Sequence, residues 1–258
     1  MFDEMKRARV TPSVITFNAL ISACEKGNQY EKAFQVFDEM KRAGVSPDVV
    51  TFNALISACE KGNQYEKAFQ VFDEMKRAGV TPDVVTFNAL ISACGGAGEW
   101  RRALAVFEEI GRGGLAADEA TYFALVTVLM GSGQIEEAME VWSAGKSKGA
   151  ITVVAAGPGE LDVHGLSAEG AVLELRIHLR ELRRLWAGGQ TAPGRGLRVI
   201  TGWGRHSEGG EAVLKPAVLR FLNEECGLRA AEDPGNAGVV VVSKKALDHW
   251  LTAQTASL

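Results

Sequence analysis

Two short motifs in the C-terminal half of the chain combine residue types that can cleave or bind a phosphodiester. The first, LDVHGLS, runs from Leu161 to Ser167 and places Asp162 two residues before His164. Because side chains alternate along a strand, the carboxylate and the imidazole are expected on one face. An imidazole can take the proton of an attacking hydroxyl, and a carboxylate can orient the ring. The motif therefore predicts His164 as a general base and Asp162 as its partner.

The second motif, ITGWGRHS, begins at Ile200 and follows an apolar stretch that predicts a strand. Glycines leave backbone N–H groups free to approach a phosphate, and a cation or imidazole can neutralise charge or protonate a leaving oxygen. Both motifs are expected at the carboxyl ends of neighbouring strands, where open α/β sheets bind ligands. The predicted phosphate-binding residues are Thr201, Gly202, Gly204 and Arg205, and His206 is the second catalytic candidate.

Structural interpretations of both motifs stay open. A D-x-H pair also forms ordinary hydrogen bonds, and a TGWG turn also serves as a plain connection from strand to helix. If RNA is the substrate, its own 2′-hydroxyl can attack and no metal is required. If DNA is cut, Mg²⁺ or Mn²⁺ is expected, with Asp162 as the candidate ligand. No other cofactor is predicted.

The N-terminal half is built from a repeated sequence. Copies begin at Thr16, Thr51, Thr86 and Thr121, a period of 35 residues, and thirty letters of the first two copies are identical. A fixed period in this range is typical of an array in which each unit stacks on its neighbours.

Each repeat is predicted to form two helices. Residues 49–60 carry Phe52 and Ile56 at helical spacing, and residues 65–78 form the second amphipathic segment. Gly62 lies between them, and we expect it to be a left-handed C-terminal cap. One unit cannot bury both apolar stripes, so the units are expected to stack into a superhelix.

The pattern TFNALISAC…G…YEKAFQVFDEMKRAGVTPD resembles the pentatricopeptide repeat (PPR) in its length, its T-F-N start, its central Gly and its terminal P-D. The resemblance implies an α-solenoid of helical hairpins in a right-handed superhelix. It also implies binding of single-stranded RNA, one base per repeat, in which Asn with Asp favours uracil. The implied units are a partial repeat at 1–13, repeats at 14–48, 49–83 and 84–118, and a degenerate repeat at 119–149.

The implied base-recognition residues form three pairs, which are Asn18 with Asp48, Asn53 with Asp83, and Asn88 with Asp118. The aliphatic residues that would flank each base are Ile15, Val50 and Val85. An Asn amide offers a donor and an acceptor to a base edge, and a carboxylate can orient it. The alternative is structural, with Asn in a first helical turn and Asp as a helix cap. Phe123 replaces the Asn in the fourth unit, so no base recognition is expected there.

The C-terminal segment predicts a small α/β layer with partly parallel strands. The expected strands are 160–164, 197–201 and 238–243, and the expected helices are 167–187 and 212–226. The two motifs, followed by LKPAV, resemble the small MutS-related (SMR) domain, whose members include nicking or RNA-cleaving endonucleases. The resemblance implies a two-layer α/β SMR domain at 160–258 after a linker at 150–159.

A repeat array followed by this domain resembles the PPR-SMR proteins of plant and algal organelles. This implies an organellar RNA-processing endonuclease, in the chloroplast rather than the mitochondrion, that binds U-rich single-stranded RNA as a monomer, with DNA as a second candidate partner. The net charge is −4 and neither half is strongly basic, so binding must come from local patches. Two alternatives stay open: a non-catalytic nucleic-acid scaffold of organelle gene expression or signalling, and a solenoid that binds a peptide.

Other features bound the class of protein. No membrane span or targeting peptide is visible, so no membrane partner is expected. Because Met1 opens inside a repeat, we expect further repeats and a targeting segment upstream. Cys24, Cys59 and Cys94 recur at one repeat position in an apolar helix, which predicts small core residues in a reducing compartment.

Overall fold

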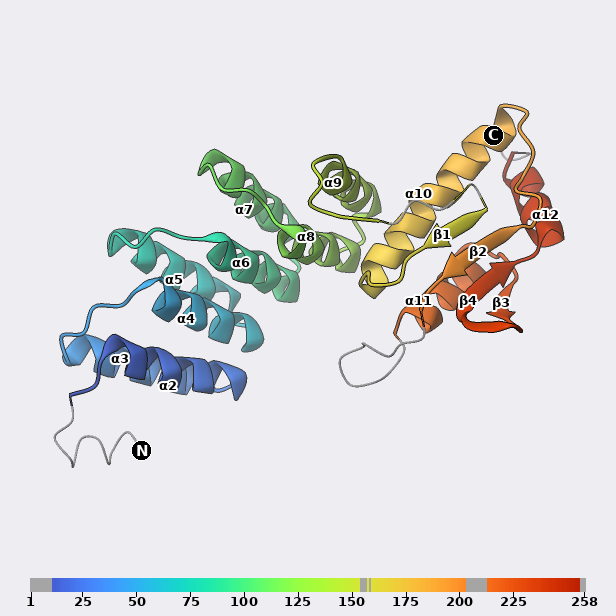
Figure 1. The fold of residues 1–258 in the computed structure, drawn as a ribbon. Coiled ribbons are helices and arrows are strands. Elements are labelled where there is room, and N and C mark those ends of the chain that lie inside the picture. The colour runs from blue at the N-terminus through green and yellow to red at the C-terminus, as the bar shows by residue number, and fades with distance from the viewer. Residues whose placement is uncertain (1–10, 154–156, 158, 203–212, 256–258) are drawn as a thin grey trace. The chain divides into compact units, whose positions relative to one another are not determined.

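The computed structural model describes residues 11–153, 157, 159–202 and 213–255 of the chain, and Figure 1 shows the fold. The chain divides into two compact units, Met1–Ile135 and Glu136–Leu258. The first is a helical solenoid and the second a small mixed sheet with helices, so the predicted fold class is confirmed. Within the described ranges, no helix has both the length and the apolar character of a membrane span.

The repeat period appears in the array as helices of nearly constant length. They are α2 (Val14–Lys26), α3 (Tyr30–Arg42), α4 (Val49–Lys61), α5 (Tyr65–Arg77), α6 (Val84–Ala97), α7 (Trp100–Arg112) and α8 (Glu119–Gly131). The first helices α2, α4, α6 and α8 contact one another in turn, and α2, α4 and α6 also pack against the second helices of their own repeats, α3, α5 and α7. This arrangement buries the stripes that a single repeat would expose.

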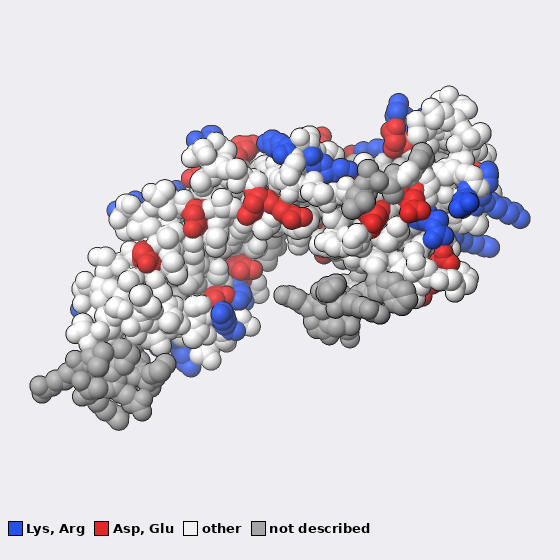
Figure 2. Space-filling model, viewed as in Figure 1, with Lys and Arg blue, Asp and Glu red and all other residues white. Residues whose placement is uncertain are grey.

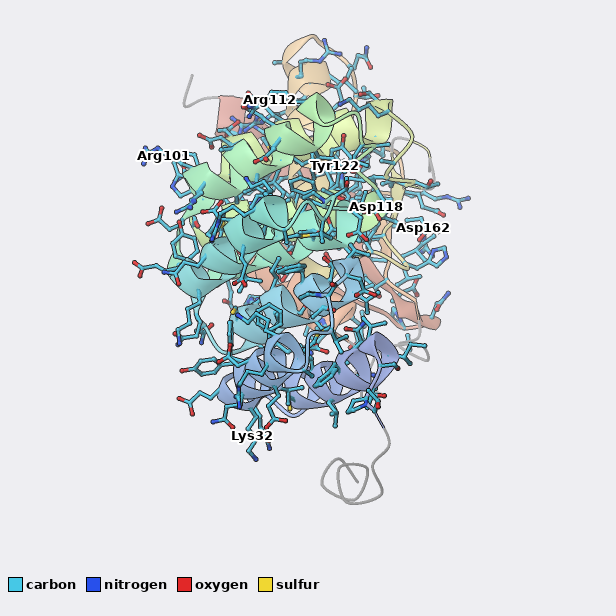
Figure 3. All side chains as sticks on the ribbon, turned by 90° about the vertical axis from the view of Figure 1, so that its left-hand side faces the viewer. Lys32, Arg101, Arg112, Asp118, Tyr122 and Asp162 are labelled. Atoms are coloured by element: carbon cyan, nitrogen blue, oxygen red, sulfur yellow. The ribbon has the colours of Figure 1, made fainter. Side chains whose placement is uncertain are left out.

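An aromatic contact recurs at each junction between repeats. The ring pairs are Phe37–Phe52, Phe72–Phe87 and Phe107–Tyr122, edge-on, with centroids 5.9, 5.7 and 5.3 Å apart. Edge-to-face pairs stabilise packing beyond the area that they bury. Tyr122, labelled in Figure 3, is 1% exposed. The contact thus ties the second helix of one repeat to the first helix of the next.

The turn inside the repeat differs from the prediction. Gly62 is not left-handed, because its φ is −83°; the left-handed residue is Asn63, with φ 51°. Asn tolerates this region better than most residues with a side chain. Gly62 is required for a different reason, since a Cβ there would lie 2.8 Å from the ring of Tyr30 in the preceding repeat.

The predicted cysteine positions lie in or near the array core. Cys59 and Cys94 are fully buried, whereas Cys24 is partly exposed. Burial raises the pKa of the Cys59 thiol to about 11 and that of Cys94 to about 12. These two residues therefore serve as small apolar core residues.

The second unit contains a sheet of four described strands in the order β1-β2-β4-β3. Its elements are β1 (Glu160–Asp162), α10 (Ala168–Ala187), β2 (Leu197–Ile200), α11 (Leu214–Arg220), the π-helical turn η1 (Phe221–Glu225), β3 (Ala230–Asp233), β4 (Asn236–Val242) and α12 (Lys244–Thr255). β1 and β2 are parallel, whereas β4 is antiparallel to both β2 and β3. The sheet is therefore mixed, as predicted.

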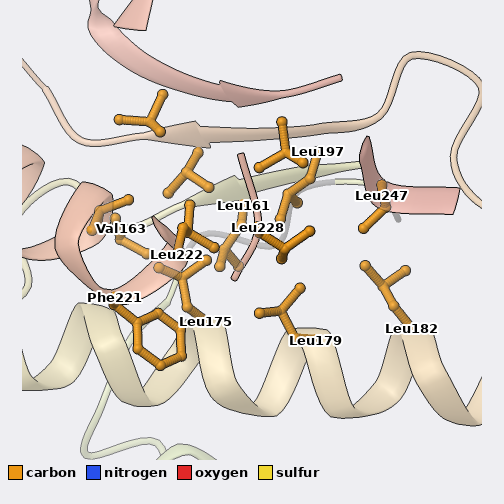
Figure 4. Packing of buried hydrophobic residues seen from close by; sticks show 14 of the residues in the cluster. Leu161, Val163, Leu175, Leu179, Leu182, Leu197, Phe221, Leu222, Leu228 and Leu247 are labelled. Atoms are coloured by element: carbon orange, nitrogen blue, oxygen red, sulfur yellow. The ribbon is translucent and has the colours of Figure 1, made fainter. Parts of the chain in front are cut away.

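One apolar core joins this sheet to its helices (Figure 4). Leu175, Leu179 and Leu182 of α10 recur at helical spacing and face Leu161 of β1 and Leu197 of β2. Residues of α11, η1 and α12 complete the same cluster. Because these helices share one core with the strands, the unit has the two layers that were predicted.

Helix α9 (Ile135–Ser147) continues the repeat pattern in sequence but is anchored to α10 by a buried polar contact. Trp142 Nε1 and Lys146 Nζ each donate a hydrogen bond of 2.6 Å to the carboxylate of Glu174. Glu174 is 6% exposed, and a Cβ on Gly170 would come within 2.6 Å of the Trp142 indole. The repeat period places the end of the array at residue 149, whereas the compact C-terminal unit already begins at Glu136.

Candidate functional site

The predicted Asn–Asp pairs join the first helices of successive repeats. In each pair the Asn side chain donates Nδ2–H to Oδ1 of the Asp that ends the same repeat and precedes the first helix of the next. The distances are 3.0 Å for Asn18–Asp48, 3.0 Å for Asn53–Asp83 and 3.4 Å for Asn88–Asp118. The structure therefore brings together the residues that the repeat register pairs in the sequence.

The same aspartates cap helices, so the structural and the binding interpretations hold at once. Asp48, Asp83 and Asp118 are the N-caps of α4, α6 and α8, and each accepts the backbone N–H of the residue three positions on. Burial raises the pKa of each carboxyl, but the hydrogen bonds from Thr and Asn outweigh burial and leave the pKa below its usual value. The carboxylates are therefore held ionised at neutral pH.

A threonine is part of this site and was missed by the sequence prediction. Thr51 Oγ1 donates to Asn18 Oδ1 at 2.6 Å, and Thr86 Oγ1 donates to Asn53 Oδ1 at 2.6 Å. Both threonines are fully buried. The signal in the sequence is the D-V-V-T spacing, which places Thr at the third helical residue of a capping box.

The predicted base-flanking residues are among the few large hydrophobic side chains that are exposed. The exposed fractions are 76% for Ile15, 54% for Val50 and 57% for Val85. Their positions, three residues before each Asn, repeat with the array. Each can therefore offer an apolar surface to a planar ring beside the Asn–Asp pair.

Charges of both signs are interspersed on the face that Figure 2 displays. Basic side chains on the second helices of the array pair with acidic ones of the next repeat, such as Lys41 with Glu74 at 3.4 Å and Lys76 with Glu109 at 3.8 Å. Such pairing is typical of a solvated helix surface. These ion pairs offset one another and leave little net charge on this part of the helix surface.

In the second unit, the D-x-H motif forms the predicted pair at the end of β1. Asp162 Oδ1 lies 2.5 Å from His164 Nδ1 and also accepts the backbone N–H of His164 at 3.0 Å. The His164 side chain is 58% exposed and that of Asp162 is 13% exposed. With Nδ1 held by the carboxylate, Nε2 is the ring nitrogen left to exchange a proton with a substrate.

The second motif starts beside this pair, because Asp162 lies opposite Ile200 in the parallel register. A Cβ on Gly202 would be 3.4 Å from the Cβ of His164, and Gly202 has a φ of 74°, a conformation that favours glycine. The structure thus places the described start of the second motif, residues 200–202, beside the first, as the topology predicted.

The donors that were predicted to cradle phosphate at the start of this motif are already engaged. The backbone N–H groups of Thr201 and Gly202 and the hydroxyl of Thr201 all donate to the carbonyl oxygen of Gly238. Their hydrogen bonds therefore do not support this part of the prediction. Gly204, Arg205 and His206 lie outside the described residues, so their roles stay predictions.

The donor set at Asp162 does not fit a divalent cation well. A magnesium ion in proteins is usually held by one or two carboxylates together with water and substrate phosphates. Oδ1 of Asp162 already serves His164, and the described part of the chain contains no cluster of three His, Cys, Asp or Glu that could hold a metal ion. No step through a metal is therefore derived.

Three family models match the chain. They are the pentatricopeptide repeat domain over residues 1–61 and 35–97, the PPR repeat family over 82–130, and the Smr domain over 161–245. The chain belongs to the pentatricopeptide repeat family and has a C-terminal Smr domain. The predicted PPR-SMR architecture is thereby confirmed. Comparison with curated proteins gave no match.

Several solved structures of PPR proteins resemble this chain. The pentatricopeptide repeat protein PPR10 in complex with an 18-nt psaJ RNA element is 25% identical, with a TM-score of 0.57; the match covers 84% of this chain and 27% of that protein. PPR10 from maize is 26% identical, with a TM-score of 0.51, and the match covers 75% of this chain and 27% of that protein. The PPR domain of Arabidopsis thaliana protein-only RNase P 1, in complex with tRNA, shares the fold at 19% identity and a TM-score of 0.51. That match covers 58% of this chain and 80% of that domain. This chain therefore spans about a quarter of the length of PPR10.

Proposed function

We propose that the PPR array binds single-stranded, uracil-rich RNA through its Asn–Asp pairs. The observation that carries the proposal is the recurrence of one polar pair, Asn to Asp, at three successive junctions of the array. In the first two pairs the amide spends one N–H on Asp and one oxygen lone pair on Thr. A second N–H and a second lone pair are left for the edge of a base.

Uracil suits such an amide because its edge offers a carbonyl acceptor beside the N3–H donor. The exposed aliphatic residues Ile15, Val50 and Val85 support the proposal by lining the flank of each pair. The similarity to PPR10, solved with an RNA element, supports RNA as the class of partner.

Direct binding tests this proposal. Labelled oligo-U and oligo-A of equal length are titrated with the full chain and followed by fluorescence anisotropy. We expect tighter binding of oligo-U and a smaller preference for it in Asn53→Ala, whereas Gln70→Ala on the exposed side of α5 serves as the control. Equal affinity for both oligomers would contradict base recognition and favour a solenoid that binds a peptide.

We further propose that the Smr domain cleaves RNA with His164 as general base. The 2′-hydroxyl attacks the adjacent phosphorus while Nε2 of His164 takes its proton, and Asp162 orients the ring through Nδ1. The bond from phosphorus to the 5′-oxygen breaks, and that oxygen takes a proton from a second acid, for which His206 is the predicted group. A 2′,3′-cyclic phosphate and a 5′-hydroxyl result.

A non-catalytic scaffold is the second candidate, because Thr201 and Gly202 have no free N–H to offer a phosphate. Incubation of end-labelled U-rich RNA with wild type and His164→Ala, with and without EDTA, separates the two. Cleavage by wild type that is lost in His164→Ala supports the nuclease. Cleavage unchanged in the variant would exclude this site, and no cleavage by wild type would favour the scaffold.

A further inference from the structure

The amide oxygen of Asn is held in the first two Asn–Asp pairs by a side chain of the following repeat. Thr51 Oγ1 lies 2.6 Å from Asn18 Oδ1 and 3.0 Å from Asp48 Oδ1. It also accepts the backbone N–H of Asp48 at 3.1 Å. The second pair repeats this geometry with Thr86, at 2.6 Å from Asn53 and 3.0 Å from the Asp.

The third pair is arranged differently, although its residue types are the same. Thr121 Oγ1 lies 2.7 Å from Asp118 Oδ1 and contacts that carboxylate in place of the Asn. Asn88 Oδ1 is buried and has no hydrogen-bond partner among the described residues. Its Nδ2 reaches Asp118 at only 3.4 Å. The amide of Asn88 is therefore held by one long contact.

The chemistry of the hydroxyl explains why this difference matters. A threonine hydroxyl has a single proton, which it can give to one acceptor at full strength. The shortest contact indicates that this acceptor is the Asn oxygen in the first two pairs and the Asp oxygen in the third. The hydroxyl therefore fixes which end of the amide is oxygen in two pairs but not in the third.

We propose that Thr51 and Thr86 are positioning residues that lock the amide orientation of Asn18 and Asn53, and that Asn88, which lacks this lock, discriminates uracil from cytosine less strictly. Uracil presents N3–H next to a carbonyl, whereas cytosine presents a bare N3 next to an amino group. An amide that is turned over exchanges its donor and its acceptor and then matches cytosine. A locked amide cannot make this exchange.

The sequence around the third pair offers a reason why Thr121 does not bind the amide oxygen of Asn88. Pro47 and Pro82 precede the first two aspartates, but Ala117 precedes Asp118. Proline fixes φ near −65° and so restricts the chain on which the Asp and Thr are carried. The third connection lacks that restriction.

Side-chain NMR of the free protein tests the lock without RNA. The side-chain amide groups of Asn18, Asn53 and Asn88 are followed by ¹⁵N relaxation in the full chain. In the wild type we expect the side-chain amide of Asn88 to be the most mobile of the three. Thr86→Val should raise the mobility of the Asn53 amide to a similar level, whereas Thr86→Ser should leave the Asn53 amide ordered. An Asn53 that stays rigid in Thr86→Val, or an Asn88 as rigid as Asn53 in wild type, would overturn the proposal.

The matched control is Thr121→Val. Each threonine also accepts the backbone N–H of its Asp within the capping box, so valine at any of the three positions should lower Tm by a similar amount. A purely structural role predicts that lowering alone. Only Thr51→Val and Thr86→Val should also change the mobility of the Asn in the preceding repeat.

The second test measures RNA binding, and it rests on the proposed base recognition. In oligo-U with a single cytosine, we expect the affinity ratio of uracil to cytosine at the Asn53 position to fall about five-fold in Thr86→Val, and Thr121→Val to leave its own position unchanged. An unchanged ratio in Thr86→Val would overturn the proposed effect on specificity. A wild-type chain without preference for oligo-U over oligo-A would instead contradict base recognition, while the NMR result still decides the lock.

Discussion

At each junction of the array, one carboxylate has two structural tasks. Asp83 caps α6 through the backbone N–H of Thr86 at 2.9 Å and binds the amide of Asn53 at 3.0 Å. A helix cap is worth about 1 kcal/mol, so the residue is required for the fold whether or not RNA is bound. We therefore expect a substitution at this position to change stability together with the proposed base recognition, whereas Asn53 is the cleaner probe of that recognition.

The depressed pKa values of these carboxylates predict how the array responds to acid. The folded-state pKa of Asp48, Asp83 and Asp118 lies below the ordinary value, so the ionised groups stabilise the array above about pH 4 and that contribution is lost as the pH falls through the folded pKa values. We expect the urea midpoint of the array to fall as the pH is lowered below about 4, the ordinary pKa of an aspartate. A variant with all three changed to Asn should start lower at neutral pH and lose less over that range; an equal drop would contradict the assignment.

Residue-level prediction succeeded where spacing carries the information. The Asp162–His164 contact follows from the two-residue alternation of a strand, whereas the resemblance to the pentatricopeptide repeat implied the Asn–Asp pairs and the 35-residue period located their three copies. Spacing does not show which acceptor a donor group will find in the fold. The hydrogen bond from the Thr201 hydroxyl to the carbonyl oxygen of Gly238 was therefore not predictable from the motif. The role of Thr86 required the distance to Asn53, which joins two repeats.

At the scale of elements, apolar periodicity predicted the helices of the array. The same kind of pattern predicted the elements of the second unit only in part. The strand β3 has the sequence Ala-Ala-Glu-Asp, which contains no β-branched or aromatic residue, and it forms because β4 offers an edge. The expected helix at 212–226 is instead α11 followed by the π-helical turn η1. Backbone pairing with β4 determines β3, and local propensity does not report such pairing.

The contact between α9 and α10 predicts a local loss of stability. Trp142→Phe keeps the aromatic packing but removes the Nε1–H that binds the buried carboxylate of Glu174. We expect a cost of about 1–3 kcal/mol, measured as faster hydrogen exchange of the α10 amides. Trp186→Phe, at the other end of α10 and only half-buried, is the control. Equal protection in both variants would show that the hydrogen bond does not anchor α9.

At the scale of the whole molecule, these contacts set the boundary of the C-terminal unit. A fragment that begins at Glu136 keeps Trp142 and Lys146, whereas one that begins at Glu160 loses both hydrogen-bond donors of Glu174 and the contact of the Trp142 indole with α10. We expect the shorter fragment to have the lower Tm, because it lacks these hydrogen bonds and the apolar area that Trp142 buries. Identical Tm values for the two fragments would place the boundary after α9.

The central proposal is that the array recognises one base per repeat. The most direct test is an adenine scan, in which a single adenine is moved through oligo-U and the affinity of the full chain is measured at each position. We predict a penalty at three consecutive positions, each about 1–3 kcal/mol as for other base-edge contacts, and the loss of the middle penalty alone in Asn53→Ala. An affinity that is the same wherever the adenine lies would contradict base recognition by the Asn–Asp pairs.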